Sequence, residues 1–171
     1  MPIPTDTELQ ELAEQLALVL LAQQRLIATA ESCTGGWIGK ICTDLPGSSA
    51  WYAGGVISYT MLAKTELLGV ASSLQRKAGV VSSDVAAAMA RGAVLALDSD
   101  FGIAVTGIAG PEGAVMPDQP VGTVWIGWAS IDRASTERFL FSGTREDVRR
   151  QAVAAAIQGL HARWRSLLQE P

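Results

Sequence analysis

The sequence predicts an α/β fold in which a mixed, largely parallel sheet lies between two layers of helices, as a single α/β/α domain over residues 1–171. Segments with helical spacing of apolar residues alternate with short apolar strands through the first two thirds of the chain, a pattern typical of parallel sheets. Two later apolar segments flank the turn sequence IDRAS, which predicts an antiparallel hairpin. Because 49% of the 171 residues are hydrophobic, the chain can bury a substantial core.

The first half of the chain opens with a clear helix start. Thr5 and Glu8 have the spacing of a capping box, and Leu9, Leu12 and Leu16 then recur on one helical face. Short apolar runs bounded by glycine and proline predict the strands that follow. The elements expected here are a helix over 6–23, a strand over 26–30, a helix over 34–43, a strand over 54–59 and a helix over 61–68 that is closed by Gly69.

The second half contains a helix rich in alanine and glycine, with Ser83 as its expected cap. Small side chains permit close packing of such a helix on a sheet or on a partner helix. Thr144 is the expected cap of the last, long helix, whose core face would include Val148 and Leu160. The elements expected here are a helix over 83–97, a strand over 101–105, a Gly/Pro loop over 107–120, strands over 121–130 and 136–142, and the final helix.

Composition and charge argue against several classes of protein. A net charge of −4 disfavours nucleic-acid binding. The longest apolar run, residues 16–22, is too short to span a membrane, and the polar start is unlike a signal peptide, so we expect no membrane partner and a cytoplasmic location. One histidine and two separated cysteines do not make a usual zinc site, so we expect neither a metal nor a cofactor.

Three short motifs follow the carboxyl ends of three predicted strands. Glu31 begins the segment ESCTGG after the first strand, Tyr59 and Lys64 follow the second, and Thr106-Gly107 follow the third. In an open α/β sheet, ligands bind at this edge, near the starts of the helices. The sequence therefore predicts that the three motifs line one site.

The segment ESCTGG has two interpretations. Gly35 and Gly36 would lie in the first turn of a helix, where free N–H groups and the helix dipole favour an anion or oxyanion. Alternatively, Ser32 or Thr34 simply caps that helix, and the glycines make a tight turn.

A nucleophilic Ser32 would need a base. His161 lies late in the terminal helix, which is a poor position for a triad member. Lysine is the next candidate, provided that it is partly desolvated. Lys40 would point away from the site and Lys77 lies in a polar stretch, whereas Lys64 has apolar neighbours and is the best of the three.

Two further residues have both a functional and an ordinary interpretation. Cys33 is a rival nucleophile at a helix start, although a buried, inert thiol is the simpler interpretation. Arg145 stands at the beginning of the last helix, where the dipole disfavours a cation. Its planar fork would suit a phosphate or carboxylate ligand, while pairing with Glu146 or Asp147 is the alternative.

Taken together, the motifs resemble the CinA C-terminal domain family over essentially the whole chain. The segments that carry the resemblance are TAESCTGGWIGKICTDLPGSSAWYAGGVISY, AKTELLGV, AVTGIAGP, PVGTVWIG and FSGTREDVRRQAV. Stand-alone members of that family are nicotinamide-nucleotide amidases, which act on nicotinamide mononucleotide. The resemblance implies Ser32 as nucleophile, with Lys64 and Tyr59 as the base and its partner.

The resemblance further implies that Thr106, Gly107 and Arg145 bind the substrate. We add Glu31, Thr34, Gly35 and Gly36 to the expected substrate-binding set, the last three through their backbone N–H groups. Members of the family are commonly dimers, so a homodimer is expected. The chain departs from the family at Met61, where a polar residue is common, and in the loop from Glu112 onwards.

Two other functions stay open from the sequence. One is a nucleotide-binding or interaction module without catalysis, with a role in competence or the damage response. The other is hydrolysis of a different amide at the same site.

Overall fold

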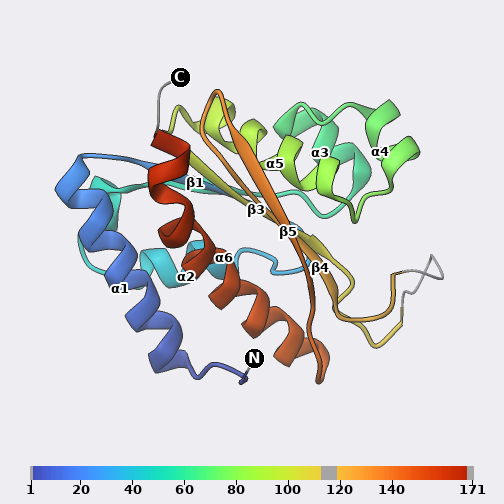
Figure 1. The fold of residues 1–171 in the computed structure, drawn as a ribbon, viewed down its shortest axis with the longest axis horizontal. Coiled ribbons are helices and arrows are strands. Elements are labelled where there is room, and N and C mark those ends of the chain that lie inside the picture. The colour runs from blue at the N-terminus through green and yellow to red at the C-terminus, as the bar shows by residue number, and fades with distance from the viewer. Residues whose placement is uncertain (1, 113–118, 169–171) are drawn as a thin grey trace.

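The computed structural model describes residues 2–112 and 119–168, and a central sheet separates two layers of helices (Figure 1). In chain order the elements are α1 (Asp6–Gln23), β1 (Ile27–Glu31), α2 (Trp37–Thr43), a 3₁₀ turn (Ser48–Ala50), β2 (Tyr52–Ile57), α3 (Met61–Leu68), α4 (Ser72–Ala78), α5 (Ser83–Leu97), β3 (Phe101–Gly107), β4 (Thr123–Ala129), β5 (Ala134–Leu140) and α6 (Arg145–Leu168).

The sheet has five strands in the order β2-β1-β3-β4-β5. β1 pairs in parallel with both β2 and β3, whereas β4 and β5 form an antiparallel hairpin that joins the far side of β3. The predicted fold class, a mixed and largely parallel sheet in one α/β domain, is therefore confirmed. The carboxyl ends of β1, β2 and β3 lie at one edge, where the three motifs begin.

The two helical layers cover opposite faces of the sheet (Figure 1). α1, α2 and α6 share one hydrophobic cluster with the sheet, while α3 and α5 share the other. The small residues of α5 allow this packing. A Cβ at Gly102 on β3 would lie 2.1 Å from the Ala90 carbonyl oxygen, and a Cβ at Gly127 on β4 would lie 2.5 Å from the Ala86 carbonyl oxygen. The helix therefore rests almost directly on β3 and β4.

Most predicted elements are present, and the differences have local causes. α2 begins at Trp37, three residues later than expected, because Gly35 and Gly36 adopt φ values of +63° and +93°. α4 was not predicted. It has no side-chain cap, and the buried side chain of Gln75 instead ties it to the Met61 and Val70 carbonyls. Such contacts between elements leave no periodic signal in the sequence.

Other sequence expectations concern ends and loops. The cap of α5 is Ser82, one residue before the expected Ser83. Thr144 caps α6 as expected, by accepting a hydrogen bond from the Asp147 N–H. Of the predicted 107–120 loop, residues 113–118 lie outside the described part.

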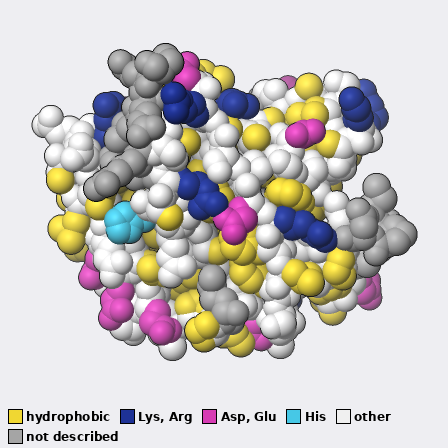
Figure 2. Space-filling view, viewed as in Figure 1, with side chains coloured by type: hydrophobic (Ala, Val, Ile, Leu, Met, Phe, Trp, Pro, Cys, Tyr) yellow, Lys and Arg dark blue, Asp and Glu magenta, His cyan; other side chains and the backbone are white. Residues whose placement is uncertain are grey.

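Both basic and acidic side chains lie on the surface of the protein. On the face drawn in Figure 2, Lys and Arg side chains lie in the upper and middle parts, and acidic side chains lie there and along the lower rim. None of the helices in the described part is both long and apolar enough to cross a bilayer.

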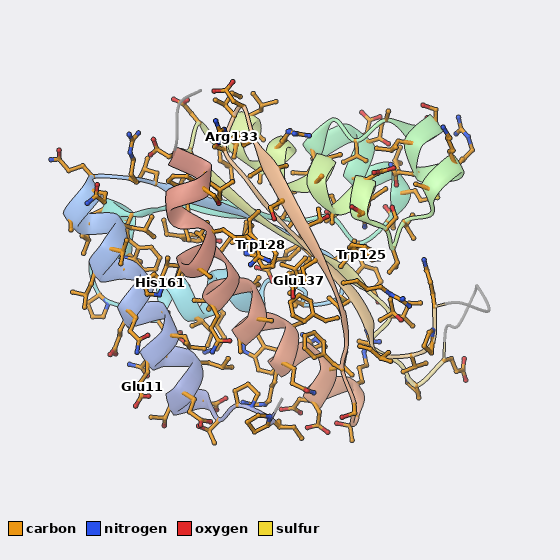
Figure 3. All side chains as sticks on the ribbon, in the orientation of Figure 1. Glu11, Trp125, Trp128, Arg133, Glu137 and His161 are labelled. Carbon is orange, nitrogen blue, oxygen red and sulfur yellow. The ribbon has the colours of Figure 1, made fainter. Side chains whose placement is uncertain are left out.

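Helix α6 crosses the sheet over the fully buried indole of Trp128 (Figure 3). The Trp128 Nε1 donates a 2.8 Å hydrogen bond to the Ala156 carbonyl, which fixes the ring beneath the helix. A Cβ at Gly159 would lie 2.0 Å from the ring atom Cζ2.

We predict that Gly159→Ala lowers the free energy of unfolding by about 1–3 kcal/mol, despite the better helix propensity of alanine, because the fixed ring cannot move aside. Urea denaturation measures this, with Gln158→Ala at the neighbouring exposed position as the control. An unchanged or higher midpoint for Gly159→Ala would contradict the packing described above.

Candidate active site

A cavity of about 400 Å³ opens at the edge of the sheet where β1, β2 and β3 end. Its walls include Ser32, Tyr59, Lys64 and Thr106 from the three motifs, together with Arg145 from the start of α6. The structure thus brings the three motifs together, as their shared place after parallel strands predicted, and adds Arg145, which lies 113 positions after Ser32.

Ser32 and Lys64 form the chemical centre of the cavity. Lys64 Nζ lies 3.2 Å from Ser32 Oγ and donates a 2.6 Å hydrogen bond to the Ser58 carbonyl. Lys64 is only 1% exposed and Ser32 only 8%. Burial lowers the pKa of Lys64 to about 8, so a useful fraction of the amine is neutral near physiological pH. A neutral lysine in this position can accept the proton of the serine hydroxyl.

The position of Lys64 follows from local structure. Thr60 caps α3 by accepting a hydrogen bond from the Ala63 N–H, and the helix then carries Lys64 back over the end of β1. Leu68 is buried on the same helix and packs into the cluster beneath α5. A capped, anchored helix therefore holds the amine against the serine.

Tyr59 and Arg145 form a second group at the mouth of the cavity. Arg145 donates one hydrogen bond to the Gly110 carbonyl, at 2.7 Å, and one to the Tyr59 hydroxyl, at 3.2 Å. Tyr59 is 62% exposed. The described hydrogen-bond partner of the Tyr59 hydroxyl is thus Arg145 rather than Ser32 or Lys64.

Thr106 and Gly107 shape the wall of the cavity. The Thr106 hydroxyl donates a 2.7 Å hydrogen bond to the Val80 carbonyl, which anchors the segment between α4 and α5 against the end of β3. A Cβ at Gly107 would lie 2.7 Å from Val124 Cγ2, so β4 excludes any side chain there.

Glu31 lies away from the cavity, in contrast to the expected substrate-binding role. The carboxylate is 1% exposed and accepts hydrogen bonds from the N–H groups of Gly36, Ile38 and Gly39, at 3.0, 3.1 and 2.9 Å. These are the N–H groups at the start of α2. A buried acid therefore caps the helix, and the Gly36 N–H is not free for a ligand.

Thr34 and Gly35 also lie outside the lining of the cavity. Thr34 is fully buried, and its Oγ1 has no hydrogen-bond partner among the described residues. The Gly35 N–H donates to the Ser32 carbonyl at 3.1 Å. Gly35 and Gly36 line a different depression, beside Trp37. The expectation that these glycines sit in the first turn of the helix is wrong, because the turn before α2 uses their left-handed backbone.

The rival candidates have ordinary surroundings. Cys33 borders the cavity, but burial raises the pKa of its thiol to about 11, which disfavours the thiolate. His161 is exposed on α6 (Figure 3), and Lys40 pairs with Asp44 at 2.5 Å. The described residues contain no group of side chains able to hold a metal ion.

Arg149 and Gln119 were not predicted as site residues. Arg149 donates to the carbonyls of Cys33 and Thr34, both at 3.0 Å. Gln119 borders the cavity and donates to the Val81 carbonyl at 2.9 Å. The spacing of four between Arg145 and Arg149 places both on one face of α6 and could have indicated a shared role.

Comparisons with known proteins extend over nearly the whole chain. The profile of the CinA C-terminal domain matches residues 9–164. Nicotinamide-nucleotide amidohydrolase PncC from Escherichia coli (strain K12) is 44% identical over 166 residues, which cover 96% of this chain and 98% of that protein. The Pseudomonas putida protein of the same name is 49% identical over 134 residues, which cover 78% of this chain and 83% of that protein.

A solved structure agrees in fold. The crystal structure of competence damage-inducible protein A (ComA) from Klebsiella pneumoniae subsp. pneumoniae MGH 78578 superposes with a TM-score of 0.89 at 32% identity. The match covers 94% of this chain and 99% of that chain.

The three hydrogen bonds to Glu31 lead to a stability prediction. Glu31→Gln replaces one acceptor oxygen by an NH₂ group that faces a backbone N–H, so the free energy of unfolding should fall by about 1–3 kcal/mol. Urea denaturation tests this, with the exposed Glu11→Gln on α1 as the control (Figure 3). Equal midpoints for the two variants would show that the carboxylate does not hold α2.

Proposed function

Because the chain belongs to the CinA C-terminal domain family, as its motifs predicted, we propose that it hydrolyses the carboxamide of nicotinamide mononucleotide. The products would be nicotinic acid mononucleotide and ammonia, in pyridine-nucleotide salvage. The observation that carries the proposal is the 3.2 Å approach of the buried Lys64 amine to the Ser32 hydroxyl inside an open cavity. The relatives named for this reaction support the choice of substrate.

In the proposed mechanism, Ser32 Oγ attacks the amide carbon while neutral Lys64 takes the hydroxyl proton. The Ser58 carbonyl holds the amine in place during this transfer. When the tetrahedral intermediate collapses, the carbon–nitrogen bond breaks and Lys64 returns its proton to the departing ammonia. Water then attacks the acyl carbon while Lys64 accepts a proton from the water. The bond between that carbon and Ser32 Oγ breaks, and Lys64 returns the proton to Oγ, which regenerates the hydroxyl and releases the acid.

The oxyanion needs a hydrogen-bond donor next to the nucleophile. Cys33 directly follows Ser32 and borders the cavity, and its N–H donates to no backbone carbonyl of the described residues. We assign this N–H to the oxyanion, in place of the N–H groups of Gly35 and Gly36, which have internal acceptors. A donor in this position typically lowers the barrier by about 3 kcal/mol.

Arg145 would bind the polar end of the substrate. Its guanidinium lies at the mouth of the cavity, held by Gly110 and by Tyr59. A planar cation of this kind suits the 5′-phosphate of a mononucleotide. Tyr59 then acts in substrate binding, by orienting Arg145.

The mechanism predicts that Ser32→Ala lowers the release of ammonia from nicotinamide mononucleotide by roughly 10³-fold or more, since the nucleophile is lost. An ammonia assay without added metal measures this, with Ser72→Ala, an exposed serine of α4, as the control. Wild-type turnover by Ser32→Ala would rule out the serine mechanism. Binding of the mononucleotide by the wild type without hydrolysis would identify the non-catalytic alternative instead, and hydrolysis of other amides alone would identify a different substrate.

A second prediction concerns pH. Lys64 must be neutral to act as the base, and the neutral fraction grows as pH rises through its pKa of about 8. The value of kcat/KM should therefore increase about tenfold per pH unit well below 8 and level off above it. Rates measured between about pH 6 and pH 9.5 test this. A rate independent of pH over this range would exclude Lys64 as the titrating base.

A further inference from the structure

The nucleophile loop, which we define as residues 32–36, is held by the last helix. Arg149 lies on the second turn of α6, and its guanidinium is directed at the loop with a forked geometry. Nε donates to the Cys33 carbonyl and Nη2 to the Thr34 carbonyl, both at 3.0 Å. One side chain thereby fixes the Cys33–Thr34 and Thr34–Gly35 peptide groups, the second and third after the nucleophile.

Fixing a carbonyl also fixes the N–H on the same peptide group. The peptide unit is planar and trans, so the N–H points opposite to the carbonyl. When Arg149 holds the Thr34 carbonyl, it directs the Gly35 N–H away from the guanidinium, and this N–H donates to the Ser32 carbonyl. The Ser32 carbonyl in turn fixes the direction of the Cys33 N–H, which is the donor assigned to the oxyanion.

The neighbouring Arg150 resembles Arg149 in its surroundings and serves as a matched control for it. Both guanidinium groups lie over the indole ring of Trp37, at 5.1 Å for Arg149 and 5.0 Å for Arg150. Arg150, however, donates to Asp6, Glu146 and the Pro4 carbonyl, none of which belongs to the nucleophile loop. The two residues thus share charge, helix and aromatic contact, and differ in the contact with the loop.

We propose that Arg149 is a positioning residue that orients the Cys33 N–H, and with it Ser32, for attack on the amide. This rests on the proposed function. Lysine is a poor replacement, because its shorter side chain ends in one tetrahedral ammonium and does not reproduce the planar pair of donors, Nε and Nη2, that reach the two carbonyls. The loss should therefore appear in the chemical step rather than in substrate binding.

The test compares Arg149→Lys with Arg150→Lys, which leaves charge and helix unchanged. We expect kcat of Arg149→Lys to fall by roughly tenfold to a hundredfold, with KM within about twofold and an unchanged pH midpoint, since Arg149 does not contact Lys64. Arg150→Lys should retain wild-type kcat. A wild-type kcat for Arg149→Lys would overturn the proposal. So would a fall that merely matched a loss of folded protein in thermal unfolding, because that is a structural effect.

A second measurement separates this proposal from the choice of substrate. A fluorophosphonate reacts with an activated serine: a bond forms between Ser32 Oγ and phosphorus, fluoride leaves, and the serine proton passes to Lys64. The adduct places a phosphoryl oxygen where the oxyanion would lie. Intact mass measured over time gives the labelling rate, which should be lower for Arg149→Lys and unchanged for Arg150→Lys.

The combined outcomes are distinguishable. If labelling depends on Arg149 but the wild type releases no ammonia from nicotinamide mononucleotide, the proposed function fails and the positioning role stands. If wild-type turnover is seen and both Arg149→Lys readouts equal those of the wild type, the positioning role fails and the proposed function stands. A wild type that is neither labelled nor active would overturn both.

Discussion

The site depends on the burial of one amine. Lys64 is almost fully removed from water beside Ser32, and burial lowers its pKa from 10.5 to about 8. A change of this size disfavours the ammonium form by roughly 3 kcal/mol, which the rest of the fold must supply at neutral pH. The packing of α3 against the core holds Lys64 in this buried position. A solvated lysine could contact the same serine but would stay protonated.

The nucleophile loop is held from two sides by groups of opposite charge. Glu31 accepts three N–H groups at the start of α2, while Arg149 donates to two carbonyls within the loop. The sequence left open whether ESCTGG caps a helix or forms a catalytic site. In the structure the capping belongs to Glu31, and the proposed catalytic role falls to Ser32. The acid caps the helix, and the serine is free to face Lys64. In the proposed mechanism, capping and catalysis therefore use different N–H groups of the same short segment.

Sequence reasoning was most successful where topology alone decides the outcome. Parallel strands bring their carboxyl ends to one edge, so the convergence of Ser32, Lys64 and Thr106 followed from the strand assignments. Sequence reasoning failed where the role of a residue depends on the contacts of a single side chain. Glu31 is as compatible with substrate binding as with capping until its hydrogen bonds are known, and the contact of Arg149 joins residues more than a hundred positions apart. Helix α4 was missed for the same reason, because Gln75 ties it to α3 through contacts without periodicity.

The start of α6 carries an arginine that the helix dipole disfavours. Arg145 stands in the first turn of the helix, where the dipole opposes a cation. Thr144 and Asp147 complete a cap there, and the hydrogen bonds from Thr144 hold the pKa of the Asp147 carboxyl below its usual range. With Glu146, this keeps two negative charges in the turn and offsets the unfavourable cation. The compensation permits one helix face to present Arg145 to the cavity and, one turn later, Arg149 to the nucleophile loop. In the proposed mechanism, the same helix then sets both the position of the substrate and that of the group that attacks it.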